Sequence, residues 1–113
     1  MAQENPKSGL KHVLLARFKP EISEEEVASL IAGYEALPQS IEAMKGFEWG
    51  TDVSVENLHQ DFTHVFTSTF ESPEGRDAYL VHPAHTAYAN KLLPALDKVI
   101  VLDFHPKVVC HRS

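Results

Sequence analysis

The sequence predicts an α+β fold in which a four-stranded antiparallel sheet carries both helices on one face. Strand-like and helix-like segments follow one another in the order β-α-β-β-α-β, and no internal repeat or linker divides the 113 residues. This order is typical of the ferredoxin-like arrangement. The expected strands span residues 11–19, 46–52, 62–71 and 98–106, and the expected helices span residues 23–37 and 73–96.

The first strand and helix have clear boundaries. Residues 11–19 are rich in apolar side chains and end at Pro20, which cannot donate to a strand ladder. Ser23 then begins a capping box that Glu26 closes. Apolar side chains recur at helical spacing up to Leu37, so we expect an amphipathic helix that Pro38 ends.

The next two strands are separated by a polar connection over residues 54–61. Residues 46–52 place Phe47 and Trp49 in alternation, which is typical of a short strand. Residues 62–71 alternate cleanly between two faces. One face is expected to hold every second side chain, namely Phe62, His64, Phe66, Ser68 and Phe70.

The second helical region contains an internal break. Ser72 is suited to cap it, and Pro73 occupies the favoured first helical position. We expect this helix to run to about Val81, to pause at His82-Pro83, and to resume over residues 84–96.

The first and last strands are apolar on both faces, which predicts a homodimer. Val13 and Leu15 alternate with Leu14, and Val99 and Val101 alternate with further apolar side chains. The helices can cover only one face of the sheet, so the other face needs a second cover. A second copy of the chain is the simplest one, because burial stabilises by roughly 25 cal/mol per Å² of apolar surface. A ligand held on an open sheet face is the alternative.

Composition excludes several classes of partner. The net charge is −6 and no segment concentrates Lys and Arg, so neither nucleic acid nor an anionic membrane is an expected partner. The single cysteine, Cys110, cannot form an internal disulfide. Without a signal peptide or a span of ~20 apolar residues, a cytoplasmic protein is expected. We expect a disordered leader at residues 1–9, a domain at 10–108 and a tail at 109–113.

Seven histidines suggest a functional site. Those in polar segments are expected to be ordinary surface residues: His59, His105 and His111. His12 and His64 fall within apolar strands that are neighbours in a ferredoxin-like sheet, so the pattern predicts that they approach each other on one face. Two hydrogen-bonded core histidines are the alternative interpretation.

The second helical region also combines histidine with tyrosine. Tyr79, His82 and His85 are spaced three apart and are expected to share a face. Two histidines at this spacing indicate zinc only weakly, and no acidic third ligand lies nearby, so no metal is expected. A histidine beside a tyrosine suits acid–base chemistry, because the imidazole titrates near neutral pH and the hydroxyl can donate to an oxyanion.

Together, the motifs of the chain resemble the stress-responsive dimeric α/β-barrel (Dabb) family of plants. The resemblance covers residues 11–106 and rests on Lys11-His12, Phe18-Lys19, Met44-Lys45, Trp49-Gly50, Asp52-Val53, Thr63-His64, Thr69-Phe70-Glu71-Ser72, His82-Pro83-Ala84-His85 and Asp103-Phe104. It implies a homodimer of two sheets packed face to face. Residues 52–64 are similar to heat-stable antifungal members, which implies a heat-stable, defence-related stress protein and the possibility of higher oligomers.

The resemblance also implies an alternative function, because the family includes a cofactor-free polyketide cyclase that closes a ring by intramolecular aldol condensation. Its catalytic base corresponds to His85, and the partner for the substrate oxyanion corresponds to Tyr79. Expected substrate-binding residues are His12, His64, Tyr34, Ile31 and His82. Ile31 and Leu96 stand where the cyclase has bulky aromatic residues, so its chain-length specificity does not transfer. A purely structural assembly unit is a third interpretation.

Overall fold

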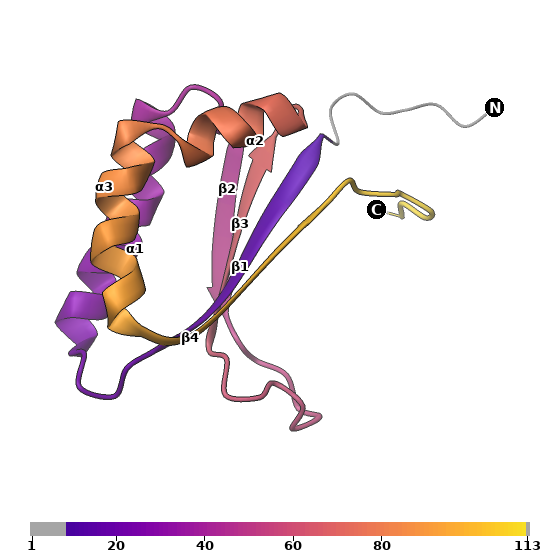
Figure 1. Ribbon diagram of the computed structural model, residues 1–113. Helices are drawn as coiled ribbons and strands as arrows, with labels where there is room; N and C mark the ends of the chain where they lie inside the picture. The colour runs from indigo at the N-terminus through magenta and orange to yellow at the C-terminus, as the bar shows by residue number, and fades with distance from the viewer. Residues whose placement is uncertain (1–8, 113) are drawn as a thin grey trace.

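The computed structural model describes residues 9–112 and has the predicted order of elements (Figure 1). The expected leader lies outside the described residues except for Gly9. The elements are β1 (Leu10–Phe18), α1 (Glu24–Ser40), β2 (Gly46–Thr51), β3 (His64–Phe70), α2 (Pro73–Leu80), α3 (Pro83–Leu92), the short 3-10 helix η1 (Leu93–Ala95) and β4 (Leu96–Phe104).

The sheet is antiparallel with strand order β2-β3-β1-β4, and the helices lie on one side of it (Figure 1). The ferredoxin-like prediction is therefore confirmed. Leu14, near the middle of β1, pairs with Phe66 of β3 and Val101 of β4. The helix-facing side of β1 buries His12, Leu14 and Ala16, and the main core lies between this side and the helices.

Two helix boundaries differ from the expectation. Helix α1 continues through Pro38 to Ser40, because Leu37 and Ile41 are buried there and the amide of Ile41 bonds the carbonyl of Leu37 at 2.9 Å. The missing proline N–H removes one helical bond in the last turn, where packing compensates. The second helical region ends at Leu92 instead of residue 96, and Leu96 already pairs with β1.

The predicted break in the second helical region is present. Helix α2 ends at Leu80, and α3 starts at Pro83 with His82 as its N-cap. Nδ1 of His82 accepts a hydrogen bond from the amide of Ala84 at 3.0 Å. The His82 cap satisfies an amide at the start of α3, and Pro83 suits the first helical position because its missing N–H needs no partner there. Together they allow a new helix to start at this point.

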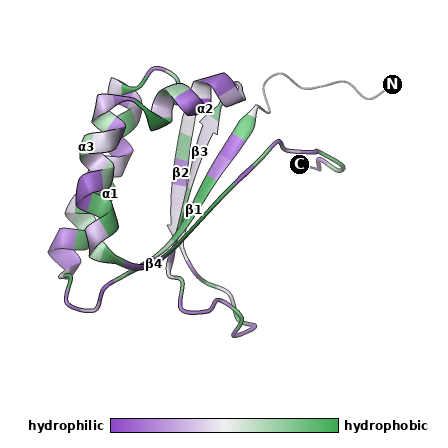
Figure 2. Cartoon of the chain, in the orientation of Figure 1, coloured by the Kyte–Doolittle hydropathy of each residue, from purple (hydrophilic) through white to green (hydrophobic). Residues whose placement is uncertain are grey.

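The side of the sheet that faces away from the helices is apolar and uncovered within the described chain. Figure 2 shows mostly hydrophobic residues along β4. Strand pairing places these side chains together on what we call the helix-free face: Val13, Leu15, Val65, Ile100, Leu102 and Phe104. Leu102 is 62% exposed and Phe104 is 50% exposed. Among the described helices, none is long and apolar enough to cross a membrane.

Candidate functional site

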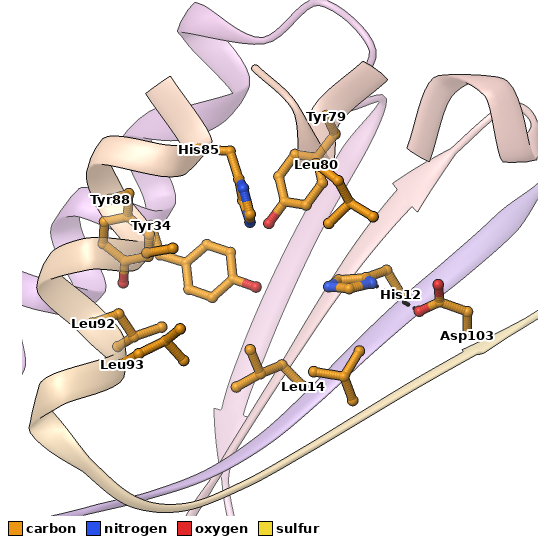
Figure 3. Close-up of a pocket in the computed structure, with 12 residues that line it drawn as sticks. His12, Leu14, Tyr34, Tyr79, Leu80, His85, Tyr88, Leu92, Leu93 and Asp103 are labelled. Atoms are coloured by element: carbon orange, nitrogen blue, oxygen red, sulfur yellow. Dashed lines mark hydrogen bonds and ion pairs between the residues drawn. The ribbon is translucent and has the colours of Figure 1, made fainter. Parts of the chain in front are cut away.

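A pocket of about 280 Å³ lies between the helices and the β1–β4 side of the sheet (Figure 3). Its wall is almost entirely apolar, although six of its side chains carry a polar group. These six are His12, Tyr34, Tyr79, His85, Tyr88 and Asp103. The remaining lining residues are Leu14, Leu80, Ala89, Leu92, Leu93 and Val101. Few polar groups in an apolar cavity are typical of a small-molecule site.

Tyr79 and His85 meet in the pocket from two different helices. Tyr79 lies in the last turn of α2 and is almost fully buried, whereas His85 lies in the first turn of α3. Their ring centroids are 4.4 Å apart, and Figure 3 shows the imidazole beside the phenol hydroxyl. The break before Pro83 produces this contact, since it turns the axis of α3 away from that of α2 (Figure 1).

Burial sets the protonation of both groups. It lowers the pKa of His85, with a smaller lowering from nearby His12, while the backbone of Leu80 acts in the opposite direction. Nδ1 of His85 is buried without a well-formed hydrogen bond among the described residues. Burial strongly raises the pKa of Tyr79. At neutral pH the site therefore combines a neutral imidazole, which can accept a proton, with a phenol that stays protonated and can donate a hydrogen bond.

Tyr34 contributes a second phenol from α1. Its ring stacks on Phe66 at 4.9 Å and contacts Tyr88 at 5.1 Å between centroids. Its hydroxyl points toward the middle of the cavity in Figure 3. Burial raises the pKa of Tyr34, which the nearby hydroxyls of Tyr79 and Ser68 partly oppose. Tyr34 and Tyr79 thus both present protonated phenols to the pocket at neutral pH.

His12 is connected to an ion pair that the sequence pattern does not predict. Nδ1 of His12 lies 2.7 Å from Oδ1 of Asp103, and Nη1 of Arg76 donates to Oδ2 of Asp103 at 2.9 Å. The residues come from β1, β4 and α2. Position 12 lies opposite position 103 on the neighbouring antiparallel strand. The sequence could have predicted this contact only if the register between β1 and β4 had been known.

Three predicted site residues do not line the pocket. His64 pairs with Ala16 and His12 pairs with Ser68, so the two histidines are separated by four strand positions, about 13 Å. The expectation that they approach each other is wrong, although both are on the helix-facing side.

His64 instead belongs to an aromatic cluster at the opposite end of β3. Its ring centroid lies 5.1 Å from that of Phe18 and 6.2 Å from that of Trp49. Burial lowers the pKa of His64. Ile31 is buried in the core, and His82 caps α3. These three residues serve packing or capping in the described chain.

The remaining histidines are on the surface, as predicted: His59, His105 and His111 are exposed. Nδ1 of His59 accepts from the amide of Asp61 at 2.9 Å, which stabilises the β2–β3 connection. Within residues 9–112, no group of three histidine, cysteine, aspartate or glutamate side chains is arranged to hold a metal ion.

Residues 10–106 match the family described as Stress responsive A/B Barrel Domain, or Dabb. The chain belongs to this family. It is 53% identical over 106 residues to the stress-response A/B barrel domain-containing protein HS1 of Arabidopsis thaliana, covering 94% of this chain and 97% of HS1. It is 34% identical over 98 residues to olivetolic acid cyclase of Cannabis sativa, covering 87% of this chain and 97% of the cyclase.

Solved structures show the same fold. The crystal structure of At3g17210 from Arabidopsis thaliana has a TM-score of 0.86 and 53% identity, covering 90% of this chain and 99% of that one. Hydroxynitrile lyase from Passiflora edulis has a TM-score of 0.85 and 29% identity, covering 90% and 96%. A dimeric ferredoxin-like protein from Thermobifida fusca has a TM-score of 0.75 and 22% identity, covering 87% and 91%.

Proposed function

We propose that this Dabb-family protein is a cofactor-free cyclase or lyase that acts on a small β-dicarbonyl or polyketide-like compound bound in the pocket. The buried contact between His85 and Tyr79 in an apolar cavity supports the proposal most strongly. The similarity to olivetolic acid cyclase and to hydroxynitrile lyase is further support, since both are enzymes of comparable chain length.

The reaction follows from the protonation of the two groups. Neutral His85 removes a proton from a carbon between two carbonyls, and the electron pair forms an enolate. The Tyr79 hydroxyl donates a hydrogen bond to the enolate oxygen, where low local polarity strengthens the interaction. The enolate carbon then attacks a second carbonyl of the same molecule, which forms a carbon–carbon bond and leaves an alkoxide.

The pocket favours a substrate with an apolar group. Apart from its six side chains with polar groups, the wall is aliphatic, and the pocket volume of about 280 Å³ suits a small molecule. Leu80 and Leu93 are 41% and 51% exposed, so they are available to contact a ligand at the entrance.

We also propose that the protein acts as a homodimer through the helix-free face. That face is apolar, and none of the helices within residues 9–112 covers it. A second sheet packed on it would remove this surface from water in both subunits. The dimeric state of the Thermobifida fusca neighbour supports this arrangement.

Product analysis tests the catalytic proposal. The protein is incubated with a type III polyketide synthase and a series of acyl starter units, and the products are separated by chromatography and mass spectrometry. We expect a shift from spontaneous lactones to a carboxylated aromatic product. His85→Ala and Tyr79→Phe should each lower the rate at which this aromatic product forms by about 100-fold or more.

His111→Ala is the matched control, because His111 is an exposed histidine outside the pocket. It should leave the product profile unchanged. An unaltered profile with every starter unit, or full activity in His85→Ala, would contradict the proposed chemistry.

A heat-stable, defence-related role is the second candidate. The identity of 53% to HS1, against 34% to olivetolic acid cyclase, favours it. Purified protein should recover its circular dichroism spectrum after heating to boiling and should inhibit fungal growth in culture. A melting temperature in the ordinary mesophile range of about 45–65 °C, without growth inhibition, would count against this role.

A further inference from the structure

We infer that His12 is a second acid–base residue of the pocket, and that Asp103 and Arg76 are positioning residues that hold it. The inference rests on the proposed function and adds a second residue, apart from His85, that can give a proton to the alkoxide. It also gives a role to the partly exposed ion pair between Arg76 and Asp103.

The direction of each hydrogen bond is determined by chemistry. Arg76 can only donate, so Asp103 accepts at Oδ2 over 2.9 Å. Its other oxygen lies 2.7 Å from Nδ1 of His12, a length typical of a charge-assisted bond. As a carboxylate, Asp103 accepts there too, and Nδ1 of His12 must carry a hydrogen.

The second nitrogen of His12 is therefore the reactive one. In the neutral ring a hydrogen on Nδ1 leaves a lone pair on Nε2. Figure 3 shows Asp103 on one side of the ring, while the other side faces the cavity and the Tyr34 hydroxyl. His12 itself is only 5% exposed, so this nitrogen is shielded from bulk water.

A merely structural ion pair would not need this arrangement. The side chains of Arg76 and Asp103 are 24% and 23% exposed, and surface ion pairs of this kind contribute little to stability. Arg76 already has a second partner, Asp77, at 3.0 Å from its Nε. What distinguishes Asp103 is its contact with a buried imidazole on a cavity wall, which is how a carboxylate orients a catalytic histidine.

The two histidines then divide the proton transfers. His85 takes the proton from carbon and passes it, through the tyrosine hydroxyls or water, to the free Nε2 of His12. His12 then gives this proton to the alkoxide that forms when the new carbon–carbon bond closes. Both histidines end neutral, with Nδ1–H of His12 on Asp103, so each turnover gains and loses no proton.

Every titratable group around His12 has a place in this scheme. Asp103 faces it from β4, while Arg76 and Tyr79 belong to α2. His85 faces it from α3 and Tyr34 from α1. The ring centroids of His12 and Tyr79 are 5.7 Å apart, and both rings line the same cavity as His85.

Nitrogen NMR and kinetics on the full-length protein test the inference with Asp103→Asn. The matched control is Asp77→Asn, which also removes one carboxylate from Arg76 but does not touch His12. At pH 8 the ¹⁵N signals of His12 should show a protonated Nδ1 and a bare Nε2 in the wild type and in Asp77→Asn. In Asp103→Asn this tautomer should no longer dominate.

The kinetic result should separate in the same way. Asp103→Asn should lower kcat by about 100-fold or more with little change in KM, Asp103→Glu should restore part of the loss, and Asp77→Asn should stay within about twofold of wild type. An unchanged His12 tautomer in Asp103→Asn, or equal kinetic effects of the two asparagine variants, would overturn the inference.

If His85→Ala abolishes turnover while Asp103→Asn does not, only this inference fails. If no substrate is turned over, the proposed function fails and the tautomer still decides the positioning role.

Discussion

Replacing Leu102 by alanine tests whether the helix-free face is the dimer interface. Leu102 pairs with Val13 in the middle of this face, and 62% of it is exposed in the single chain. In a twofold dimer the same patch is used by both subunits, so one substitution acts twice. The change leaves the core between sheet and helices untouched.

The expected magnitude follows from this exposure. Complete burial of a leucine side chain is worth about 1.5–3 kcal/mol. Burial of the exposed 62% therefore contributes about 1–2 kcal/mol for each subunit. Two copies per dimer give about 2–4 kcal/mol, which corresponds to a dissociation constant raised by roughly 30- to 1,000-fold. Leu102→Asp should weaken association further, because each subunit would bury an unpaired charge.

Sedimentation equilibrium over a concentration series measures the dissociation constant. Val55→Ala is the matched control, since Val55 is 94% exposed in the β2–β3 connection outside the helix-free face. It should associate like wild type. A wild-type protein that is monomeric at micromolar concentration, or a Leu102→Ala variant within threefold of wild type, would refute the reasoning.

Two further predictions concern stability. In Gly33→Ala the added Cβ would lie 3.0 Å from Cε1 of Tyr88, whose hydroxyl is held by the carbonyl of Leu30 at 2.6 Å. The overpacking cost of about 1–3 kcal/mol should exceed the helix-propensity gain of about 1 kcal/mol, so urea denaturation should show a net loss; a gain would mean that Tyr88 moves freely. Burial lowers the pKa of His64 and of His85 below 6.5, so the unfolded chain binds protons at higher pH than the folded one. The free energy of unfolding should therefore decrease as the pH falls through about 6.5 and level off below the lowered pKa values; His64→Gln should show a shallower decrease, and an identical pH dependence would contradict this explanation.

Local chemistry was enough to predict most of the elements and the central pair of the site. Ser23 and Ser72 cap α1 and α2 as expected, because a cap depends only on nearby amides. The pause before Pro83 is likewise a local property. The motif around that pause made Tyr79 and His85 candidates, and the structure brings them together.

Other parts of the site depend on how distant segments align. The spacing of Tyr79, His82 and His85 predicted one shared helix face. In the structure the helix breaks between α2 and α3, and His82 is the N-cap of α3. Neighbouring strands predicted that His12 and His64 approach each other, yet the register offsets them by four positions. Register is fixed by packing over the whole sheet, which the pattern of one strand does not contain.

The sequence by itself determined the order and type of the elements, because capping, turn formation and hydrophobic periodicity act over only a few residues. It also determined that the helix-free face is apolar, since strand alternation alone assigns side chains to faces. Only the tertiary structure decided that Asp103 and Arg76 reach His12 and that Ile31 packs in the core instead of lining the pocket. Contacts between side chains far apart in the chain depend on strand register and helix packing, which the whole molecule settles at once.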